Sequence, residues 1–201
     1  MIEILFVGDG PRDKAIVPEL VRRILSIELT QQFNAWPRLH GTASEHGYKR
    51  KLRYAIRQAR ERKVDGLVAT VDRDRSANRA RLAELQDARE LDRRSSPPIP
   101  TALGEARPHL EAWLLDDLTA IREVLVIPST EELPLNRKTN DPKAELDHLI
   151  SNWCRPGDAP MTILVAIAQR VDVSRSQDPR STGFEEFVGD VQSELAPLIS
   201  N

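Results

Sequence analysis

Short apolar runs alternate with longer amphipathic segments along the chain, and this alternation predicts an α/β fold. Residues 2–7 and 64–71 are rich in branched apolar side chains, as is typical of buried parallel strands. Further strands are predicted at 34–39 and 99–103, and Pro37 favours an edge position for the first of these two. The pattern therefore predicts a mostly parallel central sheet flanked by helices.

The longer segments have helical periodicity at residues 46–63, 77–91, 108–115, 160–170 and 184–199. Another helix follows Gly8-Asp9-Gly10-Pro11, and Pro18 within it leaves two alternatives: the main helix begins there, or it is kinked. Asp141 and Pro142 have the character of an N-cap and a first helical residue. Residues 126–140, with few apolar side chains, are expected to form a loop or local insertion.

The length of 201 residues corresponds to one large domain, and 40% hydrophobic residues suffice for a core. We expect an α/β core over residues 1–125 and a helical C-terminal extension over 126–201, packed together as a single globular unit. No apolar run is long enough to span a bilayer, and no signal peptide is visible. The single cysteine, Cys154, excludes an intrachain disulfide, so a cytoplasmic location is expected.

Charge is strongly segregated, although the net charge of the chain is only −2. The helix predicted at 46–63 carries eight Lys and Arg residues against one acidic residue. We expect this helix to contact nucleic-acid phosphates, since basic side chains that neutralise phosphates release counterions. The alternative is an ordinary solvated helix face. The candidate binding residues are Lys49, Arg50, Arg53, Arg57 and Arg60.

Acidic residues follow three of the predicted strands: Asp9 and Asp13 after the first, Asp72 and Asp74 after another, and Glu111 after the last. The carboxyl ends of parallel strands meet at one edge of a sheet, where ligands bind. Carboxylates gathered there repel one another unless a cation neutralises them, and Mg²⁺ or Mn²⁺ suits such oxygen ligands. Turn formation and helix capping are the alternative explanation for each pair. Neither a P-loop nor a dinucleotide-binding glycine loop occurs.

Asp9-Gly10-Pro11-Arg12-Asp13, followed by Val71-Asp72-Arg73-Asp74, resembles the Toprim core of topoisomerases, primases and overcoming-lysogenization-defect nucleases. The chain resembles more closely a bacterial Toprim-like family known as domain of unknown function 4276. The segments that carry this resemblance are residues 108–115, 141–143 and 181–187. It extends over almost the whole chain.

The resemblance implies Mg²⁺-dependent or Mn²⁺-dependent phosphodiester chemistry. Carried over to this chain, Asp9 has the proton-transfer role, and Asp72 and Asp74 hold the metal and complete the catalytic set. Glu111 is a further metal-ligand candidate and Asp9 another, while Asp13 and His109 are expected to support the ligands. Toprim enzymes usually have Glu where this chain has Asp9. The shorter side chain bears on catalysis more than on metal binding, because proton transfer depends on distance.

The leading hypothesis is a metal-dependent, nuclease-like Toprim protein, the effector of a bacterial antiphage system with an ATPase partner. A second hypothesis is a non-catalytic Toprim-like binding or regulatory subunit, which Asp9 in place of Glu favours. A phospho-acceptor receiver domain ranks far below both, because the chain lacks a clear Lys after a fifth strand.

Overall fold

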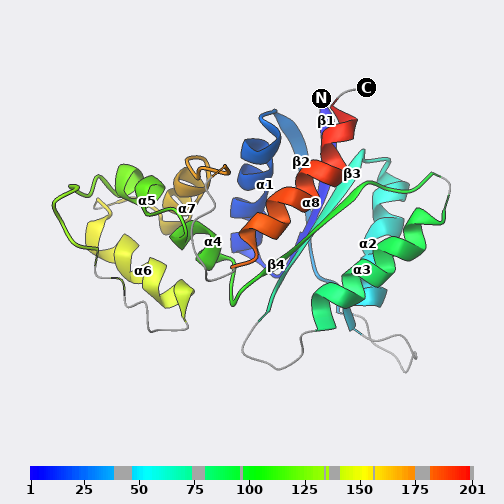
Figure 1. Ribbon diagram of the computed structural model, residues 1–201, viewed down its shortest axis with the longest axis horizontal. Helices are drawn as coiled ribbons and strands as arrows, with labels where there is room; N and C mark the ends of the chain where they lie inside the picture. The colour runs from blue at the N-terminus through cyan, green and yellow to red at the C-terminus, as the bar shows by residue number, and fades with distance from the viewer. Residues whose placement is uncertain are drawn as a thin grey trace.

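Four parallel strands form the sheet of the computed structural model, which describes residues 1–38, 47–73, 80–95, 97–133, 135, 141–155, 157–174 and 182–199. Their order across the sheet is β2-β1-β3-β4 (Figure 1). The bounds are β1 (Ile2–Gly8), β2 (Leu29–Ala35), β3 (Gly66–Asp72) and β4 (Thr101–Ala106). The predicted α/β class with a parallel central sheet is confirmed.

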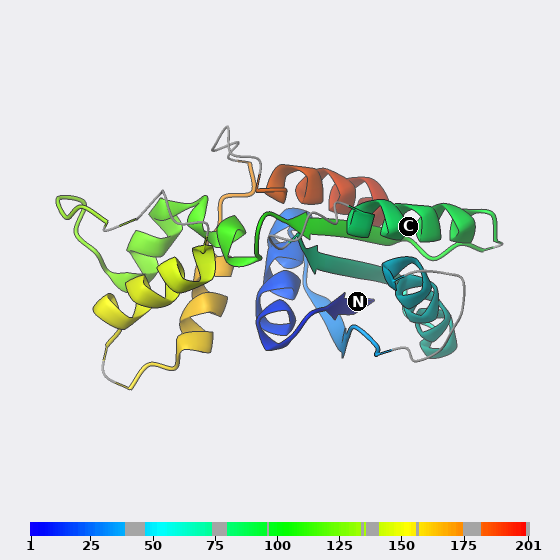
Figure 2. The ribbon, with the colours of Figure 1, turned by 90° about the horizontal axis from the view of Figure 1, so that it is seen from below.

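Helices cover both faces of the sheet. On one face lie α1 (Pro11–Leu25) and α8 (Phe184–Leu195), and on the other α2 (Gly47–Arg62) and α3 (Ala80–Arg93) (Figure 2). Side chains alternate along a strand. Ile4 and Phe6 of β1 therefore belong to the hydrophobic core under α1 and α8, while Leu5 and Val7 belong to the core under α2 and α3. The inner strands are buried on both sides, which explains their near-continuous apolar sequence.

The second strand differs from the prediction, which had placed it at residues 34–39. β2 pairs with β1 from Ile2↔Leu29 to Gly8↔Ala35. Its sequence contains mainly polar residues because it lies at the edge of the sheet, and this composition hides the strand. Trp36 follows β2 and is buried, and its indole Nε1 donates to the backbone oxygen of Thr70 at 2.9 Å.

The first helix is continuous across Pro18. It begins at Pro11, and the backbone N–H of Gly10 donates to Oδ2 of Asp13 at 3.2 Å. The alternative in which the main helix begins at Pro18 is therefore wrong. Pro18 is buried within the helix.

A group of short helices lies beyond α1, away from α2 and α3 (Figure 1). We call α5 (Leu118–Leu125), α6 (Pro142–Trp153) and α7 (Pro160–Ala168) the helical unit, and α4 (Glu111–Leu115) joins it to β4. Asp117 caps α5 by accepting from the backbone N–H groups of Thr119 and Ala120. Asp141 caps α6 by accepting from the N–H of Ala144, as predicted.

Helix α8 packs against β4 and is followed by the short helix η1 (Ala196–Leu198). Gly104 permits close packing here, because a Cβ atom on it would lie 2.7 Å from Phe187 and 2.9 Å from Trp113. The rings of Trp113 and Phe187 stack with centroids 4.7 Å apart.

The division of the chain at residue 125 into a core and a C-terminal extension stays a prediction. None of the described helices has the length and apolar character that crossing a membrane requires.

Candidate functional site

Three carboxylates meet where β1 and β3 end, and we call Asp9, Asp13 and Asp72 the acidic cluster. Asp9 follows β1, Asp13 lies in the first turn of α1, and Asp72 is the last residue of β3. Oδ2 of Asp9 accepts from the backbone N–H of Asp72 at 3.5 Å. Since parallel strands present their carboxyl ends at one edge, the topology brings together acids that are 63 residues apart in sequence.

Asp13 is buried against the sheet. Besides the bond from Gly10, it accepts a hydrogen bond at its Oδ1 from the hydroxyl of Thr70 at 3.1 Å. Gly8 makes this position possible, because a Cβ atom on Gly8 would lie 2.5 Å from the Cβ of Asp13. Sequence reasoning assigned Asp13 a supporting place. The structure places its carboxylate within the cluster itself.

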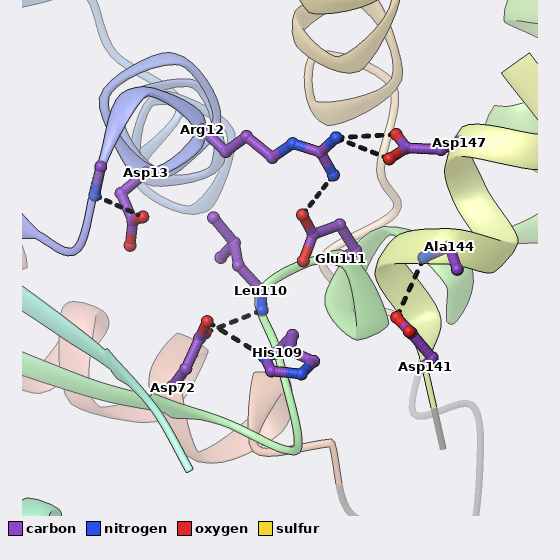
Figure 3. A network of polar contacts seen from close by, with 10 residues as sticks. Arg12, Asp13, Asp72, His109, Leu110, Glu111, Asp141, Ala144 and Asp147 are labelled. Atoms are coloured by element: carbon purple, nitrogen blue, oxygen red, sulfur yellow. Dashed lines mark hydrogen bonds and ion pairs between the residues drawn. The ribbon is translucent and has the colours of Figure 1, made fainter. Parts of the chain in front are cut away.

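Asp72 is held from the loop that follows β4. Its Oδ1 accepts from the backbone N–H of Leu110 at 3.0 Å, and its Oδ2 lies 3.2 Å from Nδ1 of His109 (Figure 3). Its backbone oxygen accepts from Arg81 of α3 at 2.6 Å. The structure thus brings His109 beside Asp72, where sequence reasoning expected it to support a ligand.

Burial and mutual repulsion both act on the acidic cluster. Burial, together with the charge of Asp9, raises the pKa of Asp13 to about 6. Burial, together with the charge of Asp13, raises the pKa of Asp72 to about 7, against the opposite effect of its hydrogen bond with His109. Both shifts mean that the charged form of the carboxyl group is disfavoured at its place in the fold. Perturbed groups gathered at one edge of a sheet are typical of functional sites.

The donor set fits a divalent cation chemically, since carboxylate oxygens are the ligands that Mg²⁺ prefers. The raised pKa values show where added positive charge would be most stabilising. A preformed metal centre also requires that the ligands converge on one point. Within the described residues, no three His, Cys, Asp or Glu side chains have the geometry of a metal-binding group. Asp74, a predicted metal ligand, lies outside the described residues.

Glu111 is paired with an arginine, and the metal-ligand role predicted for it stays a prediction. Sequence reasoning proposed it as a metal ligand, but its buried carboxylate accepts from Nη1 of Arg12 at 2.5 Å (Figure 3). Arg12 in turn donates from Nη2 to both carboxylate oxygens of Asp147 on α6, at 2.7 and 2.9 Å. Burial opposes the charge on Arg12, but its bonds to the two acids outweigh that effect and raise the pKa of the guanidinium. This pairing does not favour the ligand role predicted for Glu111.

The basic helix occurs as predicted, as α2, but its charges are not equivalent. Arg60 donates to the buried Asp92 at 2.5 Å, and Lys49 lies 3.4 Å from Asp87, both on α3. These two predicted nucleic-acid contacts thus join α2 to α3. Arg53 and Arg57 are exposed, and Arg50 is half-buried.

Several groups at the site were not anticipated from sequence: Thr70, the N–H of Leu110, Arg12, Arg81 and Asp147. Thr70 had a usable signal, because it precedes Asp72 by two positions and therefore faces the same side of β3. The partners of Arg12 are 99 and 135 residues away, so no local pattern indicates them.

No family model and no curated protein matches the sequence. Among solved structures, the chain is similar to the C-terminal region of the OLD protein of Xanthomonas campestris pv. campestris. Identity is 19%, the TM-score is 0.43, and 98% of each chain is covered. Similarity of this degree carries no functional argument, which rests instead on the acidic cluster.

Proposed function

We propose that this protein is a Toprim-like, metal-dependent phosphodiesterase that acts on nucleic acid. The observation that carries the proposal is the acidic cluster, where the pKa values of Asp13 and Asp72 are raised to about 6 and 7. Sites for phosphoryl chemistry combine carboxylates with a divalent cation, which lowers the repulsion between them and polarises the phosphate.

In this proposal Asp13 and Asp72 hold Mg²⁺ or Mn²⁺, together with Asp74 as the sequence predicts. The cation, when bound, supplies Lewis-acid activation of a phosphoryl oxygen. Leu110 and His109 fix both carboxylate oxygens of Asp72, so its orientation is set before substrate arrives. Preorganised groups of this kind lower the cost of reaching the transition state.

Asp9 is the candidate for proton transfer. It is exposed, unlike Asp13, so its carboxylate is accessible to a water molecule or to substrate. The backbone N–H of Asp72 lies 3.5 Å from its Oδ2 and keeps it beside the other acids. A general base must come within hydrogen-bonding reach of the proton that it takes, directly or through one water.

The exposed side of α2 is the candidate nucleic-acid interface. Arg53 and Arg57 are exposed there, and Arg50 is half-buried. Lys49 and Arg60 contribute less in this proposal, since each pairs with an acid of α3. An ATPase partner and a role in defence against phage, implied by the resemblance to Toprim-like proteins, complete the proposal.

Plasmid nicking in Mg²⁺ or Mn²⁺ tests the enzymatic role. We expect nicking by the unaltered protein and its loss in Asp72→Asn, because this change removes a charged ligand. Asp158→Asn is the matched control, as Asp158 is an exposed acid that follows α6. Nicking by Asp72→Asn at the unaltered rate would contradict the proposal.

The second candidate function is a non-catalytic subunit that binds metal or nucleotide. Asp9 favours it, because Asp is one methylene shorter than the Glu of Toprim enzymes and reaches less far toward a substrate. Thermal stabilisation by Mn²⁺ that depends on Asp72, without nicking even when an ATPase partner is present, would support this candidate. An Asp9→Glu variant that gains nicking activity would identify the length of this side chain as the cause.

A further inference from the structure

Arg12 connects three parts of the molecule. It lies in the first turn of α1, within the five residues that begin with Asp9 and end with Asp13. Its guanidinium reaches Glu111 at the start of α4 and Asp147 in the middle of α6 (Figure 3). Three hydrogen bonds to two carboxylates fix the planar guanidinium in one orientation.

Arg12 and Glu111 are each next in sequence to a residue that forms or holds the acidic cluster. Arg12 directly precedes Asp13, and Glu111 directly follows Leu110, whose N–H holds Asp72. The Arg12–Glu111 pair therefore joins the backbone that carries Asp13 to the backbone that holds Asp72. Glu111 is buried, so a water molecule does not readily take the place of Arg12.

We propose that Arg12 is a positioning residue, through which docking of the helical unit sets the separation of Asp13 and Asp72. This inference rests on the proposed metal-binding function. Asp147 is the contact on α6, and it holds the second half of the guanidinium. When Asp147 is lost, the guanidinium is held by Glu111 alone and is free to rotate about that bond.

The helical unit is thus a part of the metal site, although it contributes no ligand. A partner that moves α6 alters the acidic cluster through Arg12, without contact with the carboxylates. This relationship gives a bound partner protein a defined physical route to the site. Arg12 links α6 to the acidic cluster in this way, since it bonds to Asp147 on one side and to Glu111 on the other.

The test uses full-length protein and Mn²⁺ alone as the probe, with binding measured by calorimetry. Asp147→Asn is expected to weaken Mn²⁺ binding by about tenfold, the lower end of the effect of residues that orient metal ligands. Asp147→Glu retains the charge and is expected to restore most of the affinity. Glu123→Gln on α5 is the matched control, because Glu123 is an exposed acid of the same helical unit.

A readout without metal separates positioning from a general loss of stability. In Asp147→Asn, the amide hydrogen of Leu110 is expected to exchange faster, since its acceptor Asp72 is less well placed. The melting temperature is compared in parallel with that of Glu123→Gln. A second variant, Arg12→Met combined with Glu111→Leu, removes the Arg12–Glu111 ion pair and replaces it with apolar contacts.

Unchanged Mn²⁺ affinity in both Asp147→Asn and the double variant would overturn the positioning role and leave the proposed function standing. Absence of Mn²⁺ binding by the unaltered protein would overturn the proposed function and this inference together. Weaker binding in both variants, with Glu123→Gln unaffected and Leu110 exchange accelerated, supports the inference.

Discussion

Gly8 lies directly against the side chain of Asp13. A Cβ atom on Gly8 would stand 2.5 Å from the Cβ of Asp13 and 2.7 Å from its Oδ1. The last residue of β1 therefore has to be glycine for Asp13 to reach Thr70. One missing methyl group thus decides whether a carboxylate lies in the acidic cluster.

Replacement of Gly8 with Ala is expected to displace Asp13 and to destabilise the fold by about 1–3 kcal/mol, as overpacking does. Mn²⁺ should then raise the melting temperature less than it does in the unaltered protein. Gly10→Ala is the control, since nothing lies within 4 Å of a Cβ atom there. Equal behaviour of the two variants in a thermal melt would show that the close contact has no consequence.

Stability of the metal-free protein is expected to fall as the pH rises. The pKa values of Asp13 and Asp72 are raised in the folded state, to about 6 and 7, so the folded state binds more protons than the unfolded chain. Stability is lost between about pH 4, where the two groups ionise in the unfolded chain, and about pH 7, where both have begun to ionise in the folded protein and their charges repel.

For Asp13 alone the effect over the whole pH range is about 3 kcal/mol, of which about half falls between pH 5 and pH 8. Denaturant unfolding at pH 5 and pH 8 measures it, and Asp13→Asn should show a smaller decrease between the two. Mg²⁺ should stabilise the protein at pH 8 more than at pH 5, because protons compete with the cation. A pH dependence that Asp13→Asn leaves unchanged would assign the effect to other groups.

Loss of His109 is expected to raise the pKa of Asp72 further, because its hydrogen bond lowers this pKa. In His109→Ala the pH at which Mn²⁺ binding is half complete should therefore move upward. Calorimetric titrations at several pH values measure the shift. A midpoint that stays in place, or moves downward, would show that His109 does not stabilise the charged form of Asp72.

Arg12→Met is expected to destabilise the protein by about 3–5 kcal/mol, since it leaves the buried Glu111 without its partner. Adding Glu111→Leu should recover most of this loss, because an apolar pair of similar volume replaces the ion pair. Chemical denaturation of the two variants measures the difference. Equal stability of the single and double variants would mean that Glu111 is not left uncompensated.

The basic residues of α2 should separate into two kinds. Arg60→Glu is expected to destabilise the fold, because it places a negative charge beside the buried Asp92. Arg57→Glu should leave the melting temperature unchanged while it weakens nucleic-acid binding and reduces the salt dependence of that binding. Fluorescence anisotropy with a labelled oligonucleotide over a salt series distinguishes the two. Unchanged affinity in Arg57→Glu would remove α2 from the interface.

The sequence alone predicts that Asp9 and Asp72 lie at one edge of the sheet, because the parallel topology determines where the two strands end. Asp9 and Asp72 follow two buried apolar strands, and parallel strands end at the same edge. The fold class followed from the same alternation of runs. The edge strand β2 was placed too late in the chain, since Gln31, Gln32 and Asn34 conceal a strand of which only Leu29 is buried.

The rest of the site depends on contacts that sequence does not encode locally. Glu111 has the residue type and the position of a ligand, yet the guanidinium of Arg12, in the first turn of α1, holds it. Lys49 and Arg60 belong to a basic stripe, and the acids that occupy them lie on another helix. Helix α5 was not predicted, although Asp117 directly before it has the residue type of an N-cap.

Thr70 makes one hydrogen bond through its hydroxyl and another through its backbone oxygen, and together they connect the acidic cluster to a tryptophan. Its hydroxyl donates to Asp13, while its backbone oxygen accepts from the indole of Trp36. The emission of Trp36 should therefore report on charge and occupancy at the acidic cluster, two hydrogen bonds away. With Trp113 and Trp153 replaced by Phe, intrinsic fluorescence would follow ligand arrival in real time, without any attached dye.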